Sequence, residues 1–122
     1  MTAGPRLKPT MKTFFHPPIK EVRLENVLYA LSDPVRLSVV QQLDSQGEMT
    51  CGEFSCAEPK GKSTMTHHFR VLRESGLIHT QVDGREHLTT LRRKELDAKF
   101  PGLLGSILSA AESARPLAKS RR

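Results

Sequence analysis

The chain has 122 residues, of which 37% are hydrophobic and 26% charged, with no Trp; this suits one compact domain with a modest core and excludes two. No apolar run approaches the roughly 20 residues of a membrane span, and no secretory signal is evident, so we expect a cytoplasmic protein without a membrane partner. Two cysteines do not make a disulfide scaffold. The formal net charge of +6 favours a polyanionic partner without specifying which one.

The positive charge is unevenly distributed along the chain. Residues 1–20 hold four bases and no acids, residues 21–61 three bases and seven acids, and residues 62–93 and 94–122 six bases and three acids each. An acidic stretch therefore separates a basic start from a basic second half. A surface that binds a polyanion produces such segregation, although a charge run is more often only a solvated face.

Prolines, glycines and apolar periodicity divide the chain into three segments. Residues 1–19 contain four Pro and one Gly with little periodicity, and we expect a flexible basic arm there. Residues 20–114 carry the periodic segments and form the predicted domain. Residues 115–122 are a short basic tail. The sequence leaves open whether the arm or the tail touches a polyanion.

Two helices are predicted at the start of the domain. Apolar residues recur at the spacing of one helix face over residues 24–31. Asp33 and Pro34 then favour a new helix start, because Asp accepts hydrogen bonds from free N–H groups and Pro suits the first turn. The second helix is predicted to stop near residues 45–47.

Two more helices are predicted in the middle of the chain. Thr50 and Glu53 have the spacing of a capping box, which indicates a short helix over residues 50–57. A longer helix is predicted from about residue 63 to 75, and Gly76 is its C-terminal stop.

A β-hairpin and a last helical region follow. Residues 77–82 and 86–91 have strand-like patterns, and Asp83-Gly84 between them is a favoured tight-turn dipeptide. Helical character resumes over residues 93–100 and, after Pro101-Gly102, continues from Leu103. The predicted fold is therefore mainly α with a small β-hairpin, in the order helices, hairpin, helix. This is the layout of a winged helix-turn-helix, in which one helix can enter the DNA major groove.

The helix over residues 62–75 and the wing over residues 78–90 carry the candidate DNA contacts. At about 100° per residue, Met65, Phe69 and Leu72 point to the core. The opposite side presents small hydrogen-bonding groups and cations, which suit base edges and phosphates. With the cation at the hairpin tip, the candidate DNA-binding residues are Lys62, Ser63, Thr64, Thr66, His67, Arg70 and Arg85.

Two runs of this sequence resemble the ArsR/SmtB family of bacterial repressors. They are Ala-Leu-Ser-Asp-Pro-Val-Arg-Leu over residues 30–37 and Ser-Thr-Met-Thr-His-His-Phe-Arg-Val-Leu-Arg-Glu-Ser-Gly-Leu-Ile over residues 63–78. Gly84-Arg85 matches the wing of the family, and the resemblance covers about residues 22–92. It implies a homodimeric repressor that reads a near-palindromic operator on double-stranded DNA and releases it on an unidentified signal.

In that family the first and last helices form the dimer interface, which agrees with the apolar stripes near both ends of this chain. Part of the first stripe is expected to be ordinary core of one chain. The candidate interface residues are Leu24, Val27, Leu28, Leu104, Ile107, Leu108 and Ala111.

The cysteines leave three interpretations of an effector site open. Cys51 and Cys56 lie five residues apart, so an unbroken helix turns them about 140° away from each other, and they do not reproduce the Cys-x-Cys-x-x-Cys motif of the arsenic-sensing relatives. They are small buried residues, redox-active thiols, or ligands of a soft metal or metalloid, in that order of preference. We otherwise predict no cofactor.

The histidines and the last helix do not suggest a metal site. His67 and His68 point about 100° apart, so we expect His68 to turn inward and His67 towards DNA. His79 and His87 could face each other across the hairpin. The last helix, from Leu103, contains one Glu and no His or Asp, which argues against a zinc-type site.

A second class of function remains open at this stage. A winged-helix module that binds another protein, without specific DNA binding, would keep the apolar stripes but would have no use for the polar helix face, because a fold does not dictate its function. No Ser/His/Asp arrangement, paired carboxylates or Gly-rich phosphate loop is evident, so we predict no enzyme activity. The operator, the regulated genes and the inducer are not specified by the sequence.

Overall fold

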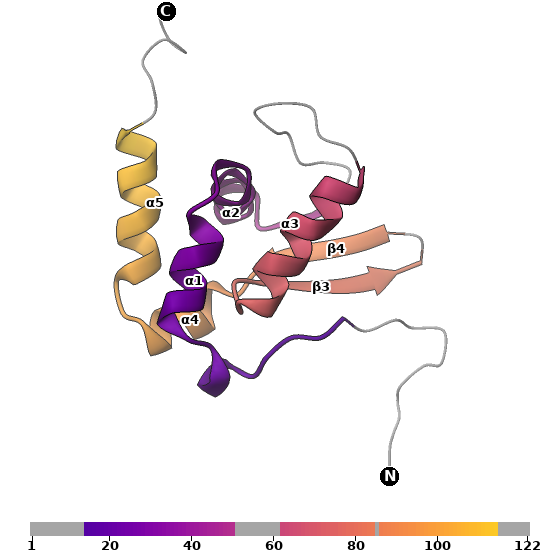
Figure 1. Cartoon of the computed structure of the whole chain (residues 1–122), viewed down its shortest axis with the longest axis horizontal. Helices are drawn as coiled ribbons and strands as arrows, with labels where there is room; N and C mark the ends of the chain where they lie inside the picture. Colours follow the sequence, from indigo (N-terminus) through magenta and orange to yellow (C-terminus); the bar gives the residue numbers. More distant parts are fainter. Residues whose placement is uncertain (1–13, 51–61, 85, 115–122) are drawn as a thin grey trace, which may run out of the picture.

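The structure is a computed structural model that describes residues 14–50, 62–84 and 86–114 (Figure 1). Helices α1 and α2 come first, strand β2 precedes α3, the hairpin of β3 and β4 follows, and two more helices complete the domain. In chain order the elements are η1 (Ile19–Glu21), α1 (Leu24–Leu31), α2 (Pro34–Gln46), β2 (Glu48–Thr50), α3 (Lys62–Glu74), β3 (Ile78–Asp83), β4 (Glu86–Leu91), α4 (Arg93–Lys99) and α5 (Leu103–Ser113). Within these ranges, no helix is long and apolar enough to cross a membrane.

The start of α2 forms as its sequence predicts. The Asp33 carboxylate accepts hydrogen bonds from the backbone N–H groups of Val35 at 2.8 Å and Arg36 at 3.1 Å, and Pro34 occupies the first turn. Burial alone would raise the pKa of Asp33, but the hydrogen bonds from Arg36 and Val35 lower it overall. The ionised cap therefore fixes where α1 ends and α2 begins.

The sheet has three antiparallel strands in the order β2-β4-β3, so β4 lies in the centre. The hairpin of β3 and β4 confirms the prediction, but Asp83 of the predicted turn dipeptide pairs with Glu86 and is the last residue of β3. Gly84 has a φ of 66°, which suits such a turn.

Strand β2 was not predicted. Thr50 is its last residue and pairs with Leu88 of β4. The remainder of the predicted helix over residues 50–57 lies outside the described residues. A three-residue strand has no periodic pattern of its own, and only the pairing with β4 defines it.

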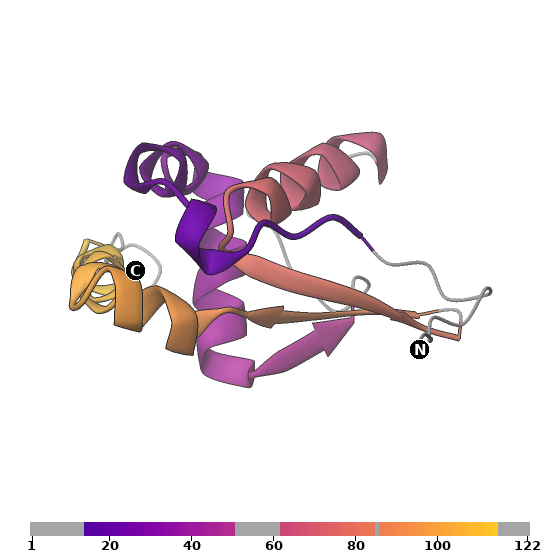
Figure 2. The same cartoon turned by 90° about the horizontal axis from the view of Figure 1, so that it is seen from below.

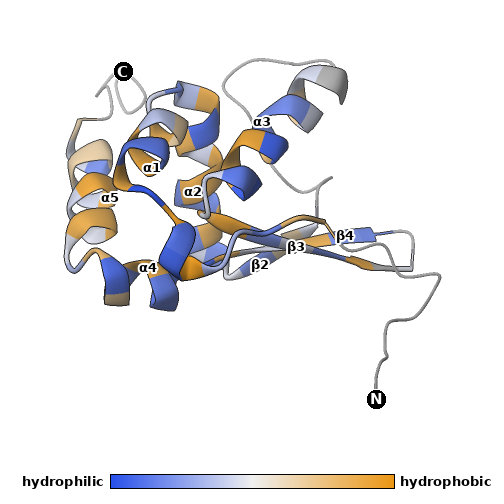
Figure 3. Cartoon of the chain, turned by 60° about the horizontal axis from the view of Figure 1, so that its bottom comes forward, coloured by the Kyte–Doolittle hydropathy of each residue, from blue (hydrophilic) through white to orange (hydrophobic). Residues whose placement is uncertain are grey.

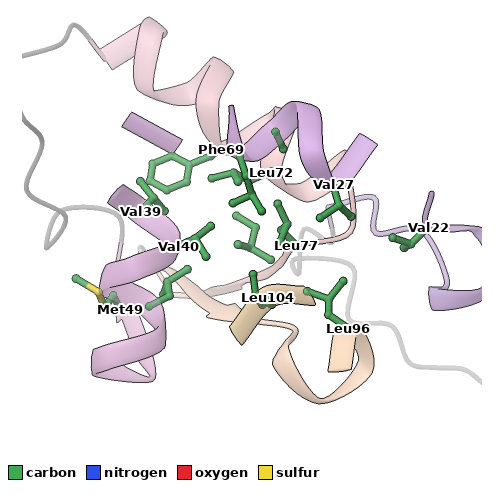
Figure 4. Packing of buried hydrophobic residues seen from close by; sticks show 14 residues of the cluster. Val22, Val27, Val39, Val40, Met49, Phe69, Leu72, Leu77, Leu96 and Leu104 are labelled. Carbon is green, nitrogen blue, oxygen red and sulfur yellow. The ribbon is translucent and has the colours of Figure 1, made fainter. Parts of the chain in front are cut away.

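The core lies between the helices and one face of the sheet (Figure 4). Val27 of α1, Leu43 of α2 and Leu72 of α3 meet there and are almost fully buried. Figure 2 shows α1 and α3 on one side of the hairpin, with α4 and α5 at the end away from the hairpin turn. Leu96 and Leu104 close the core from α4 and α5.

Residues 14–18, which the proline content assigns to the flexible arm, pack against the domain instead. We call this segment, Phe14–Pro18, the N-terminal strap. It runs between α3 and the hairpin (Figure 2). Its Pro17 is buried, and the Pro17 carbonyl accepts a hydrogen bond from Arg92 Nη1 at 2.8 Å. Residues 1–13 of the arm and 115–122 of the tail lie outside the described residues.

Candidate nucleic-acid interface

Helix α3 separates an apolar side from a polar side as predicted. Phe69 and Leu72 are buried in the core and Met65 is half-buried. The hydropathy colouring in Figure 3 shows hydrophilic and hydrophobic residues on α3. Of the predicted contact residues, the structure places Thr64, Thr66, His67 and Arg70 at the surface of α3. Lys62 and Ser63 form the start of the helix, but their side chains are outside the described part of the structure.

His68 turns inward, which confirms the expectation from helix geometry. Its Nδ1 lies 3.2 Å from Nη1 of Arg36, and since a guanidinium only donates hydrogen bonds, Nδ1 accepts this one. Arg36 is only 5% exposed. The same guanidinium donates from Nε to the carbonyl of Ala30 at 2.8 Å. Arg36 of α2 therefore joins the end of α1 to the inner side of α3 and fixes the orientation of that helix.

The hairpin projects away from the body as a two-stranded ribbon beside α3 (Figure 1). Its described tip carries exposed Gly84, Glu86 and His87. The predicted contact residue Arg85 lies outside the described residues. A helix with an exposed polar face and an adjacent projecting hairpin is the arrangement that lets one element enter a groove while the other reaches the neighbouring backbone.

The expected pairing of His79 with His87 across the hairpin is wrong. His79 lies opposite Thr90 and His87 opposite Val82, because the register places the two histidines three positions apart along the ribbon. Each contacts the N-terminal strap instead: His79 stacks on His16 with ring centroids 4.2 Å apart, and His87 meets Phe14 edge-on at 5.3 Å.

The histidine of the strap has an altered acidity. Burial, together with smaller electrostatic effects of His79, Arg92 and Arg73, lowers the pKa of His16 from its ordinary 6.5 to about 4. His16 is therefore neutral at pH 7, and its Nε2 accepts a hydrogen bond from the backbone N–H of Thr80 at 3.0 Å. No sequence pattern marked this contact, because its partners are 64 residues apart.

The structure tests the candidate effector residues only in part. Cys51 and Cys56 lie outside the described residues. Across the ranges 14–50, 62–84 and 86–114, no three His, Cys, Asp or Glu side chains come together as metal ligands do.

The two terminal helices expose part of their apolar stripes. Leu24, Leu28 and Tyr29 of α1 are 42%, 44% and 62% exposed, although all are large hydrophobic or aromatic side chains. Ile107, Leu108 and Ala111 of α5 are half-buried. Both helices lie on the side of the molecule away from the hairpin turn (Figures 1 and 2).

Two residues predicted at the dimer interface belong to the core of one chain. Val27 and Leu104 are each only 2% exposed and lie in the same apolar part of the interior as Leu96 and Phe100. They are already covered within the monomer, so they have little surface left for a partner. The sequence pattern does not distinguish them from Leu24 or Leu28, because one apolar helix stripe is wide enough to face both a core and a neighbour.

The helical layers, the exposed polar face of α3 and the projecting hairpin define the class of winged helix-turn-helix DNA-binding proteins. Comparison with known proteins narrows the class. The family described as "Helix-turn-helix domain" matches residues 31–81. The chain is 35% identical to YceK, an uncharacterized HTH-type transcriptional regulator of Bacillus subtilis (strain 168), over 82 residues, which are 66% of this chain and 82% of YceK.

Two further relatives identify the branch. The arsenical resistance operon repressor of Staphylococcus xylosus is 29% identical over 79 residues, which are 61% of this chain and 70% of the repressor. The crystal structure of an ArsR family transcriptional regulator superposes with a TM-score of 0.57 and 25% identity, over 75% of this chain and 98% of that chain. The chain belongs to the ArsR family of winged-helix transcriptional regulators. It is a DNA-binding repressor, which sets aside the interpretation as a protein-binding module.

Proposed function

We propose that the protein acts as a homodimer that reads a near-palindromic operator, with α3 in the major groove and the hairpin as the wing. The observation that supports this proposal is the exposed polar face of α3. It presents Thr66, His67 and Arg70 next to the hairpin. Two recognition helices related by a two-fold axis contact half-sites about 34–36 Å apart, and this geometry matches a palindromic sequence.

The exposed apolar residues of α1 support the dimer. Leu24, Leu28 and Tyr29 lie within six residues of each other, and exposed large apolar groups that cluster are typical of an interaction surface. α5 adds Ile107, Leu108 and Ala111 on the same side of the molecule. A two-fold interface built from α1 and α5 leaves α3 and the hairpin free to face DNA.

A titration of DNA binding tests the role of α3. Duplex from the promoter region of the protein itself is titrated by fluorescence anisotropy at several salt concentrations, where binding should weaken steeply with salt. Arg70→Ala should reduce the affinity by about tenfold and lower the salt slope by about one per protomer. The matched control is Lys94→Ala, which removes an exposed cation from α4 and should leave both values unchanged. Equal effects of the two variants would contradict the assignment of α3.

Sedimentation velocity tests the dimer. The double variant Leu24→Glu/Leu28→Glu puts two charges into the proposed interface and should shift the protein from dimer to monomer at micromolar concentration. Ala98→Glu, on the exposed side of α4, is the control and should remain dimeric. A wild-type protein that sediments as a monomer at all concentrations, while it still binds DNA, would contradict the proposal.

The releasing signal is a separate question, and the cysteines are the groups to test first. Cys51→Ser and Cys56→Ser are assayed for DNA release in the presence of oxidant and, separately, of soft metal ions. Loss of release in either variant supports a cysteine-based effector. Full release in both variants would reject every such effector and leave the thiols as small packing residues.

A further inference from the structure

The outer part of the hairpin has little support from the sheet. Among the strands that the structure describes, β2 pairs with β4 from Leu88 to Thr90, so Glu86 and His87 have their strand partners on β3. β3 is an edge strand of this sheet. A two-stranded ribbon is only marginally stable in water. A hairpin that must keep one position relative to α3 therefore needs contacts from outside the sheet.

The N-terminal strap contacts the outer hairpin and α3 at the same time (Figure 2). The guanidinium carbon of Arg73 on α3 lies over the Phe14 ring, 4.3 Å from its centre, and the same ring meets His87 of β4 edge-on. One side chain therefore bridges the helix and the part of the hairpin that β2 does not reach. Arg73 follows Arg70 by three residues, so both lie on one side of α3 and the strap borders its polar face.

His16 fixes the strap to the outer edge of β3. Its Nε2 accepts the hydrogen bond from the backbone N–H of Thr80 at 3.0 Å, and its ring stacks on His79. This N–H points away from the sheet, where an edge strand is otherwise open. At the other end of the strap, the Pro17 carbonyl accepts a hydrogen bond from Arg92, whose side chain is 7% exposed. The strap is therefore attached to both the base and the outer part of the hairpin.

We propose that Phe14 and His16 are positioning residues for DNA binding, which fix the hairpin relative to α3 so that the recognition helix and the wing meet the duplex together. This inference rests on the proposed docking of α3 and the hairpin. The two residues act through the hairpin and not through contact with DNA. A wing that is ordered before binding loses less conformational entropy when DNA binds, and the difference increases the affinity.

Two neighbouring aromatic residues provide a matched pair of variants for the anisotropy titration. Phe14→Ala removes the bridge between Arg73 and His87 and should weaken binding to the promoter duplex by about fivefold, because the hairpin must then be ordered on binding. Phe15→Ala removes a ring of the same size that is 66% exposed, and should leave the affinity unchanged. Phe14→Tyr retains the ring and should bind as the wild type does. Equal losses in the two alanine variants, or no loss in Phe14→Ala, would overturn the proposal.

The hydrogen bond to His16 provides a second test. His16→Ala leaves the N–H of Thr80 without its acceptor and should weaken DNA binding by about threefold. The amide oxygen of Gln can accept the same hydrogen bond, so His16→Gln should recover most of the affinity. If His16→Gln loses as much affinity as His16→Ala, the acceptor does not position the hairpin and this role of His16 is overturned.

Backbone amide heteronuclear NOE values of the free protein distinguish positioning from general destabilisation. In Phe14→Ala, the amides of Val82, Glu86 and His87 should show lower values as the outer hairpin becomes mobile on the picosecond to nanosecond timescale, whereas those of α5 should not change. Equal changes throughout the domain, or none in the hairpin, would overturn the proposal. Absence of salt-dependent DNA binding by the wild type would instead contradict the proposed function, so the two failures are distinguishable.

Discussion

Replacement of Arg36 by Met should destabilise the protein although it removes a buried charge. Arg36→Met leaves the Ala30 carbonyl and Nδ1 of His68 without their donor, at distances of 2.8 Å and 3.2 Å in the wild type. Each abandoned buried acceptor costs about 1–3 kcal/mol, and the relief of the buried guanidinium offsets part of this cost. We expect a net loss of about 2–3 kcal/mol in the free energy of unfolding, which corresponds to a Tm lower by roughly 10–20 °C.

Urea denaturation followed by circular dichroism measures this loss as a lower midpoint with an unchanged slope. Arg23→Met is the matched control, because Arg23 is exposed and pairs with the exposed Glu25, a kind of ion pair that contributes about 0–1 kcal/mol. The reasoning is refuted if Arg36→Met is as stable as the wild type or more stable. In that case the buried cation costs as much as its hydrogen bonds supply, and the junction of α1, α2 and α3 does not depend on it.

Three more outcomes follow from the contacts described above. The pKa of His16 is about 4 in the folded state and ordinarily 6.5, so the unfolded chain binds a proton first as the pH falls. The free energy of unfolding should therefore decrease between pH 6.5 and 4. In urea titrations at each pH, His16→Gln should show a smaller decrease over this interval than the wild type. Gly76→Ala should lower the free energy of unfolding by about 2–4 kcal/mol in the same assay, because φ is 93° and the new Cβ would lie 2.4 Å from Val22 Cγ2. The control Gly47→Ala, where φ is 91° but no atom lies near the new Cβ, should cost about 1–2 kcal/mol. Equal costs for the two variants would exclude the clash with Val22. Asp33→Ala should cost about 1 kcal/mol through the lost cap, and an unchanged denaturation midpoint would show that Pro34 alone starts α2.

Local signals predicted the helices well. Asp33-Pro34 and Gly76 mark element ends through their own backbone chemistry, and the apolar spacing of Met65, Phe69 and Leu72 orients α3. The polar face of the helix follows from the same periodicity. These features depend on residues at most four positions apart, and the sequence pattern therefore contains them.

Contacts between distant segments were not predictable in this way. β2 exists because Met49 pairs with Thr89, and the histidines of the hairpin find His16 and Phe14 instead of each other. The strap has no periodicity, and its prolines are typical of loops, so its contacts follow only from the folded structure. The same applies to Val27 and Leu104, whose burial depends on how α1 and α5 pack.

The strand order β2-β4-β3 has a consequence for the growing chain at the ribosome. The central strand of the sheet is the last to be synthesised, so β2 and β3 have no strand partner until residues 86–91 emerge. Pairings between distant residues also form slowly, because loop closure must precede them. A chain that stops before Glu86 would keep two open strand edges, which promote aggregation, and would have no wing. The protein therefore gains its sheet and the hairpin that we propose as its wing together, once β4 has left the ribosome.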